Sequence, residues 1–389
     1  MPHLGVTVYP DLDSFENIDA YLKMASKYGF TRVFSSMFSM EGTVEEVICC
    51  FTRLIEIAHS YHMQVSLDLN PMCFERIGAS YDDLSIFHQM KCDILRMDCS
   101  FGLEKDLAMI NNPYGILLEF NASMDLSVIQ GYIDSGVEPT KLLFCHNFYP
   151  QPFTGNTWAK FIETNEVLAA KGVRVGAFVS SHAPNTHGVW DARFGLPTVE
   201  MHRELPIDLQ MRHMLATGHV TDILIGNAYA TEEELKAMHD VLNVNVKQDE
   251  ANPIVKMLSQ WMPGLGQQEV VIKIDLEEGV TDLEKEILFD FYPHADLGDS
   301  SEWIIRSRME RFTYSKNGVP VRECSKDYFK RGDIVIVNNN YQHYSGEVQI
   351  VLRDMKNDGL RNLVGHIDEN EQLLLDYTDK GVAMIFKEK

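Results

Sequence analysis

The sequence predicts an α/β protein in which a (β/α)8 barrel of the TIM type is followed by a small all-β barrel. Eight short apolar runs occur within residues 1–230, helical patterns separate them, and short alternating runs replace them beyond residue 268. A strand, a polar cluster and a helix repeated eight times are typical of a TIM barrel. The strands are expected at Leu4–Tyr9, Arg32–Ser36, Gln64–Asn70, Ile94–Asp98, Ile116–Asn121, Leu142–His146, Gly176–Ser180 and Asp222–Gly226.

The chain is longer than one barrel requires. A TIM barrel takes about 250 residues, and this chain has 389, so a second domain is expected. We predict the barrel at residues 1–245, a partly helical linker at 246–268 and the β domain at 269–389. Strands of the β domain are expected at Glu269–Asp275, Glu302–Arg308, Val319–Arg322, Asp333–Val337, Glu347–Leu352, Leu373–Tyr377 and Val382–Lys387.

Local signals at helix ends support this division of the barrel. Thr43–Glu46 and Thr231–Glu234 match the capping box, in which two side chains satisfy the free amides at a helix start. Gly29, Gly172 and Gly218 each follow a helical pattern and precede a strand, as a glycine that ends a helix does.

Composition narrows the class of protein. The formal net charge of −23 disfavours binding to nucleic acid and to anionic membranes, so an anionic substrate would need a local group of arginines. Seven cysteines, an odd number and mostly in apolar runs, indicate reduced thiols rather than a disulfide framework. No signal peptide and no run of membrane-spanning length is recognisable. We therefore expect a soluble, cytoplasmic protein.

Three carboxylates are the main candidates for catalysis. Alternation along the strands points Asp68, Asp98 and Glu119 into the barrel near the carboxyl ends of consecutive strands, where barrel enzymes carry their chemistry. Carboxyls so close together raise at least one pKa, which supplies the general acid needed to cleave a glycosidic bond. The same groups could instead hold a divalent cation, or Asp98 could simply pair with Arg96.

Other polar residues at the strand ends are candidates for substrate binding. Residues 146–149 combine imidazole, amide and aromatic groups, which stack on sugar rings and bond their hydroxyls; a packed loop is the alternative. The candidates are Tyr9, Asn70, Asn121, His146, Asn147, Tyr149, His182 and Asn227.

The connection after the seventh strand, residues 181–203, is much longer than the others and contains His187, Trp190 and Asp191. Loops of this length inside a compact domain usually have a function. We expect it to form a lid or a wall of the substrate site.

Residues that are missing from the strand ends disfavour several reactions. No lysine lies at the carboxyl end of a predicted strand, which disfavours a Schiff-base aldolase. The first strand has no His-x-His pair, which disfavours a metal-dependent amidohydrolase. Ser180–His182 does not match a nucleophile elbow, so a serine nucleophile is disfavoured too.

Arginines in the C-terminal part are candidates for anion binding. Arg306 and Arg308 share one strand face, and Arg322 lies in the next predicted strand. Guanidinium groups suit phosphate and carboxylate, although ordinary salt bridges are the alternative in a chain with 57 acidic residues.

Several ordered segments resemble one bacterial family nearly from end to end. The segments are Gly5–Pro10, Cys145–Gln151, Phe153–Gly155, Ile225–Ala230, Ile304–Ser307, Pro320–Glu323 and Arg331–Asp333. The chain resembles two-domain proteins that pair a TIM barrel with a cyclophilin-like β-barrel, among them 6-phospho-N-acetylmuramidases of the MupG type.

This resemblance implies cytoplasmic hydrolysis of N-acetylmuramic acid 6-phosphate linked to N-acetylglucosamine, during peptidoglycan recycling. Carried over by position, Asp68, Asp98 and Glu119 lie where the family's strands end, and Arg306 and Arg322 lie in its C-terminal motifs. Such hydrolysis needs two carboxyls and water, so no metal and no cofactor is expected. A metal-dependent lyase or isomerase and a non-catalytic binder of a phosphorylated sugar are the alternatives, and the oligomeric state stays open.

Overall fold

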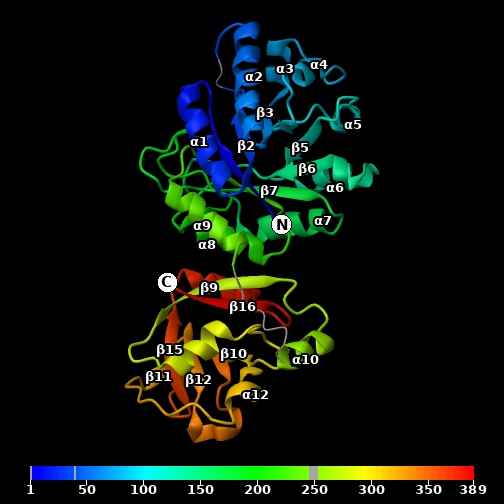
Figure 1. Cartoon of the computed structure of the whole chain (residues 1–389). Coiled ribbons are helices and arrows are strands. Elements are labelled where there is room, and N and C mark those ends of the chain that lie inside the picture. Colours follow the sequence, from blue (N-terminus) through cyan, green and yellow to red (C-terminus); the bar gives the residue numbers. More distant parts are fainter. Residues whose placement is uncertain (1, 39–40, 245–252) are drawn as a thin grey trace. The chain divides into compact units, whose positions relative to one another are not determined.

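The computed structural model describes residues 2–38, 41–244 and 253–389. The chain divides into two compact units, Met1–Asn243 and Val244–Lys389 (Figure 1). Of the predicted linker, residues 246–252 lie outside the described residues, and a helix, α10, spans Pro253–Trp261. None of the helices in the described ranges is long and apolar enough to cross a membrane.

The first unit is a closed barrel of eight parallel strands in sequential order, as predicted. The strands are β1 His3–Thr7, β2 Phe30–Ser36, β3 Gln64–Leu69, β4 Ile94–Met97, β5 Leu117–Asn121, β6 Leu142–Cys145, β7 Arg174–Val179 and β8 Asp222–Ile225. The helices between and after them are α1 Phe15–Lys27, α2 Val44–Ser60, α3 Pro71–Ile77, α4 Ser85–Gln89, α5 Leu103–Ile110, α6 Leu126–Asp134, α7 Trp158–Ala169, α8 Ile207–Ala216 and α9 Glu232–Leu242.

Both predicted capping boxes are present. Thr43 accepts from the amide of Glu46 at the start of α2, and Thr231 accepts from the amide of Glu234 at the start of α9, with the reciprocal glutamate bonds in place. Gly29, Gly172 and Gly218 all have positive φ, which a glycine adopts without strain after a helix.

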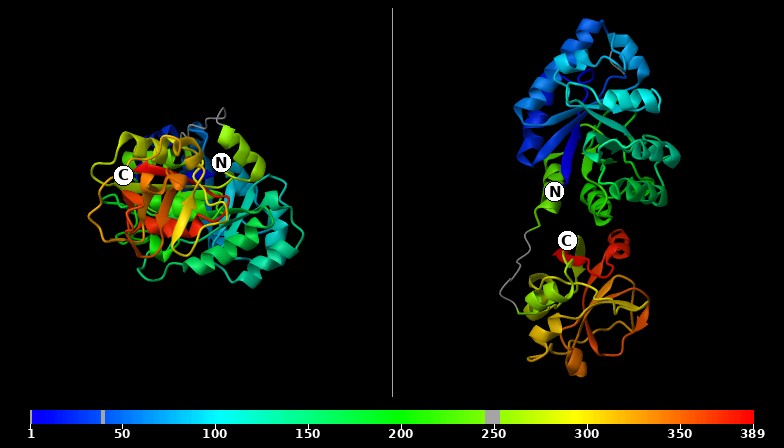
Figure 2. Two further views of the ribbon diagram at one scale, coloured as in Figure 1. Left: turned by 90° about the horizontal axis from the view of Figure 1, so that it is seen from below. Right: turned by 90° about the vertical axis from the view of Figure 1, so that its right-hand side faces the viewer.

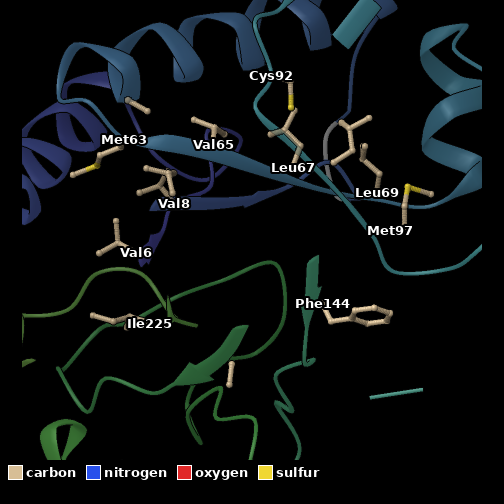
Figure 3. Packing of buried hydrophobic residues seen from close by; sticks show 14 of the residues in the cluster. Val6, Val8, Met63, Val65, Leu67, Leu69, Cys92, Met97, Phe144 and Ile225 are labelled. Carbon is tan, nitrogen blue, oxygen red and sulfur yellow. The ribbon is translucent and has the colours of Figure 1, made fainter. Parts of the chain in front are cut away.

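Alternation along each strand separates the helix-facing side chains from the barrel interior. On β3, Val65, Leu67 and Leu69 belong to the main apolar core between strands and helices (Figure 3). Ser66 and Asp68 face the other way and bond groups from β4 and β5. The period-two pattern therefore decides which side chains can line a site inside the barrel.

The barrel interior combines an apolar cluster with buried charges. Phe34, Cys145, Phe178 and Leu224 pack together inside it. A Cβ atom at Gly176 would come within 2.9 Å of Cys145 Sγ, so the close approach of β6 and β7 requires a glycine there.

The second unit is built on a mixed six-stranded sheet (Figures 1 and 2). Its order is β10-β13-β12-β15-β9-β16, and a separate pair joins β11 and β14. The strands are β9 Glu269–Leu276, β10 Ile304–Ser307, β11 Tyr328–Phe329, β12 Asp333–Val337, β13 Val348–Val351, β14 Met355–Lys356, β15 Arg361–Ile367 and β16 Ala383–Glu388. Within the described residues this is a sheet with two edge strands rather than a closed barrel, and a cyclophilin-like fold stays a prediction.

The prediction of an all-β second domain was partly wrong. Leu373–Tyr377, expected as a strand, lies in the 3-10 helix η5, Glu371–Tyr377, and Val319–Arg322 forms no strand. No strand was predicted at the position of β15. Short helical elements also occur: α11 Asp282–Lys285, the π-helical turn η3 Glu286–Asp290, α12 Glu310–Tyr314 and the 3-10 helix η4 Asn339–Tyr344.

Candidate active site

Two of the three predicted carboxylates meet at one arginine in the barrel. Arg96 Nη1 donates to Oδ1 of Asp68 and to Oδ1 of Asp98, at 2.7 Å in each case. Asp68 on β3 lies opposite Arg96 on β4 in the parallel register, so neighbouring strands create the first contact directly. Because both oxygens bond the same nitrogen, their separation is at most the sum of these two short distances.

Glu119 lies in a different set of contacts. Arg32 Nη2 donates to both of its carboxylate oxygens, at 3.0 and 3.2 Å, and Ser66 Oγ donates to one at 3.1 Å. Arg32 Nη1 also donates to Asp222 at 2.9 Å, and all three charged side chains are buried. The structure therefore brings Asp68 and Asp98 together and places Glu119 in an ion pair of the barrel interior.

A pocket of about 320 Å³ contains the Asp68–Arg96–Asp98 group. This volume is at the lower end of the range of roughly 300–1,000 Å³ for small-molecule sites. Acidic, cationic and amide groups form one part of its lining and aromatic rings the other, which suits a sugar with hydroxyl edges and an apolar face. The lining residues are Phe34, Phe38, Asp68, Arg96, Asp98, Asn147, Phe148, Tyr149, Pro150, Phe178 and Trp190.

The environment of Asp68 raises its pKa to about 6. Burial is the largest cause, because it removes water from the charged form; the positive charge of Arg96 opposes it, and Asp98 and Glu119 add smaller increases. The expected increase is therefore present, but burial contributes more to it than the neighbouring negative charges do. A carboxyl with this pKa retains a protonated fraction near neutral pH and can donate a proton.

Arg96 also bears on the alternative of a metal site. Its guanidinium occupies the position between Asp68 and Asp98 that a cation would need. Across the described parts of the chain, no three His, Cys, Asp or Glu side chains are grouped so that they could hold a metal ion. The arrangement favours acid–base chemistry at the two carboxyls.

An ion pair between the buried Arg203 and the partly buried Glu200 links the two loops that form the pocket rim. Arg203 Nη1 donates to the carbonyl oxygens of Tyr149 and Phe194 at 3.0 Å, and its Nη2 lies 2.6 Å from Glu200 Oε2. Glu200 also accepts from the amide of Phe153 at 2.7 Å. The bond to Arg203 lowers the pKa of Glu200 to about 2, so the pair stays charged. The sequence analysis did not identify either residue.

The long connection after β7 supplies part of the pocket wall through Trp190. His187 Nε2 lies 2.6 Å from Asp13 Oδ2, which ties this loop to the loop after β1. His182 Nε2 contacts the carbonyl oxygen of Arg203 at 2.8 Å and does not line the pocket.

Among the predicted binding residues of the barrel, Asn147 and Tyr149 line the pocket. Asn147 Oδ1 accepts from Arg96, and the Tyr149 hydroxyl donates to Asn156 at 3.0 Å. Three other candidates satisfy backbone groups: Asn70 Oδ1 accepts from the Cys73 amide, Asn121 Oδ1 from the Ser123 amide and Asn227 Oδ1 from the Ser181 amide.

His146 and Tyr9 are also buried beyond the pocket lining. His146 Nε2 bonds Asn165 Oδ1 at 2.8 Å, and burial lowers its pKa to about 4, so the ring is neutral. The Tyr9 hydroxyl has no hydrogen-bond partner among the described residues, and burial together with the charge of Asp68 raises its pKa. Both side chains therefore lie in the protein interior rather than at the pocket surface.

The two predicted arginines of the second unit have different surroundings. Arg306 lines a separate pocket of about 300 Å³ within that unit. Arg322 donates to Glu284 at 3.3 Å and to the carbonyl oxygen of Leu363, and it lines neither this pocket nor the barrel pocket. Its contacts join segments of the second unit.

Several pocket residues were missed by the sequence analysis. Arg96 was considered only as a partner of Asp98, and Phe34, Phe38 and Phe178 were not considered at all. Phe34 and Phe178 occupy inward positions of β2 and β7, so the same alternation that indicated the acids could have indicated them. Only polar residues were predicted as candidates, so the aromatic wall was not predicted.

Paired carboxyls at an aromatic-walled pocket in a TIM barrel define the class of (β/α)8-barrel glycosidases. Comparison with known families agrees with this class. The model of the 6-phospho-N-acetylmuramidase N-terminal domain matches residues 4–240, and that of the C-terminal domain matches residues 270–387. The chain belongs to the 6-phospho-N-acetylmuramidase family and is a glycoside hydrolase.

Solved structures match along nearly the whole chain. An uncharacterized B. cereus protein is 34% identical, with a TM-score of 0.84 over 100% of this chain and 99% of that one. A conserved Enterococcus faecalis protein of unknown function is 22% identical, with a TM-score of 0.66 over 99% and 96% of the two chains, and shows the fold. No curated protein matches.

Proposed function

We propose that this enzyme hydrolyses the glycosidic bond between N-acetylmuramic acid 6-phosphate and N-acetylglucosamine, in the cytoplasm, during peptidoglycan recycling. The name of the family supports a phosphorylated muramic sugar as substrate. The pocket supports a carbohydrate, because its lining combines aromatic rings with charged and amide groups. The observation that carries the proposal is the pair Asp68 and Asp98, which share one nitrogen of Arg96 in that pocket.

Asp68 acts as the general acid in the first step. Its raised pKa of about 6 keeps a protonated fraction available. The proton of Asp68 passes to the glycosidic oxygen while a carboxylate oxygen of Asp98 bonds to the anomeric carbon. The bond between that carbon and the leaving N-acetylglucosamine breaks.

Water completes the reaction in the second step. The carboxylate of Asp68 takes a proton from water as the water oxygen attacks the anomeric carbon. The bond between that carbon and Asp98 breaks as the new bond forms, which restores both side chains. This double displacement retains the anomeric configuration, and it requires carboxyl groups about 5–5.5 Å apart rather than the wider spacing of inverting enzymes. The shared bonding to Arg96 Nη1 supports the shorter spacing.

Glu119 acts at a distance from the reacting atoms in this proposal. It is absent from the pocket lining and is paired with Arg32. We assign it the role of holding the barrel interior beneath the catalytic pair.

The test compares amide variants on the phosphorylated disaccharide. Asp68→Asn and Asp98→Asn should each lower kcat by at least about 10³-fold, because an amide is neither an acid nor a nucleophile. Asp191→Asn, an exposed change on the neighbouring loop, is the matched control and should retain activity. Proton NMR of the first product anomer in wild-type enzyme should show retention.

Near-wild-type turnover in both variants would contradict the assignment of the catalytic pair. Product of inverted configuration would leave the pair but contradict the role of Asp98 as nucleophile. Binding of the disaccharide without turnover by wild-type enzyme would favour a sugar-phosphate sensor instead.

A further inference from the structure

A second pocket lies within the C-terminal unit. Its volume is about 300 Å³, close to that of the barrel pocket. Its lining includes two arginines, Arg306 on β10 and Arg361 on β15, and two tyrosines from η4, Tyr341 and Tyr344. None of the catalytic chemistry of the barrel uses these residues.

A chain of buried hydrogen bonds fixes both arginines. Glu347 has no solvent exposure and accepts from Arg306 Nε at 2.8 Å and from Arg306 Nη2 at 2.9 Å. Gln349 Nε2 donates to Glu347 at 2.8 Å, and Arg361 Nε donates to Gln349 Oε1 at 2.7 Å. One polar network therefore sets the orientation of both guanidinium groups from the floor of the pocket.

The side chains next to this polar network on the sheet are apolar. Val335 lies directly opposite Gln349 on the adjacent strand and packs with Val351 and Leu363 in an apolar cluster. Burying the Glu347 carboxylate among such residues is costly unless it is paired and hydrogen-bonded, and Arg306 and Gln349 supply those partners. The same bonds fix the two arginines at the pocket, and a preorganised guanidinium loses less conformational entropy when it binds an anion.

The pocket brings two arginines together in a chain whose formal charge is −23. Arg306 pairs with Asp299 and Glu347, and Arg361 pairs with Asp358. Two guanidinium groups held at one pocket suit an anionic ligand.

The tyrosines provide a flat surface beside the arginines. The rings of Tyr341 and Tyr344 are stacked, with centroids 5.1 Å apart and an interplanar angle of 8°. The guanidinium of Arg306 lies 5.7 Å from the centroid of Tyr344. Tyr341 is half exposed, so one aromatic face is available to the apolar face of a ring.

We infer that this pocket binds a phosphorylated sugar through Arg306 and Arg361, with the sugar ring against the tyrosines. The choice of a phosphorylated sugar over other anions rests on the proposed function, which gives this protein such ligands. The site belongs to the C-terminal unit alone and includes no residue of the barrel.

The experiment titrates the full-length protein with N-acetylglucosamine 6-phosphate and follows the δ-methyl signal of Ile304, which lines the pocket. Inorganic phosphate and N-acetylglucosamine serve as separate probes. Arg361→Gln and Tyr341→Ala remove one cation and one ring, and neither change strands the buried Glu347. Each should weaken the binding reported by Ile304 at least about tenfold, which corresponds to about 1.4 kcal/mol. Arg353→Gln, an exposed arginine of the same unit, should leave it unchanged.

An Ile304 signal that does not respond to the sugar phosphate overturns the inference, as does equal binding by both pocket variants and the wild type. An affinity for inorganic phosphate equal to that for N-acetylglucosamine 6-phosphate overturns the claim that the sugar ring contacts the pocket. The same titration on the Asp98→Asn protein should give the wild-type result, because this site does not depend on turnover. Failure of the hydrolysis assay alone would contradict the proposed function and leave this binding result intact.

Discussion

Asp68 experiences two opposing influences. Burial destabilises its charged form, while the guanidinium of Arg96 at 2.7 Å stabilises it. Burial prevails and raises the pKa to about 6. Burial of Asp68 therefore has two consequences: it keeps a proton available for catalysis, and it destabilises the folded protein when Asp68 is ionised.

The effect of Asp68→Asn on the free energy of unfolding should be more favourable at pH 8 than at pH 4. The folded pKa lies above the usual value of about 3.9, so the folded state binds more protons than the unfolded state between the two. Stability from this group is present below pH 4 and is lost as the pH rises through 6. The amide removes this loss, which amounts to roughly 2–3 kcal/mol. Urea unfolding of both proteins at pH 4 and pH 8 measures the difference; a difference independent of pH would contradict the cause assigned here.

Glu119→Gln should weaken the fold rather than the chemistry. Removing one charge from the buried pair leaves Arg32 with Asp222 alone, and breaking such a pair costs about 3 kcal/mol. Denaturant unfolding checks this loss, with Glu45→Gln on the exposed side of α2 as the control. The folded fraction should retain turnover within roughly tenfold of wild type. A kcat as low as that of Asp98→Asn in a stable protein would restore Glu119 as a catalytic residue.

At the scale of elements, the strands place the acids and the loops complete the pocket. Asp68 and Arg96 are fixed by the register of β3 and β4. The aromatic wall combines Phe34 of β2 and Phe178 of β7 with residues from the segments after β2, β6 and β7. Arg203 with Glu200 links the segments after β6 and β7. Two side chains that do not line the pocket therefore help to position its rim.

Arg203→Gln should loosen both loops. The variant loses bonds from a charged donor, each worth about 1.5–3 kcal/mol, so KM should rise roughly tenfold while the pH dependence of kcat is unchanged. Limited proteolysis should cut within residues 149–155 or 190–196 faster than in wild type. Arg193→Gln is the matched control, since among the described residues that exposed arginine forms its ion pair with Asp191 of the same loop. Unchanged KM and proteolysis would show that other contacts suffice to hold the loops.

At the scale of the whole molecule, the sequence predicted the first unit better than the second. Strands and helices alternate regularly in the barrel, so each predicted element limits where its neighbours in the sequence can begin and end. The second unit has no repeat. The run at Leu373–Tyr377 buries Leu374 and Leu375 in a 3-10 helix, and such a short apolar run has no period that distinguishes helix from strand. β15 combines Arg361, Asn362 and Gly365 with apolar residues and lacks a clear alternation.

The candidate site was predictable in part for a related reason. Alternation pointed Asp68 and Asp98 inward, and the structure places both at the pocket. Alternation also gave Asn70 and Asn121, and the position at a strand end gave Asn227; all three accept from backbone amides. A polar residue at a strand end has the same local pattern whether it caps a turn or contacts a ligand, because its partners come from other elements.

The sequence by itself determined the repeat of strands and helices, the helix caps and the inward face of each strand, because these depend on residues a few positions apart. Only the tertiary structure decided that Arg32 joins Asp222, 190 residues away, and that Arg96 joins the two pocket acids. It also decided the pKa of Asp68, since burial in a low-dielectric interior is a property of the folded chain. The roles of the carboxyls therefore follow from their surroundings, which local pattern does not specify.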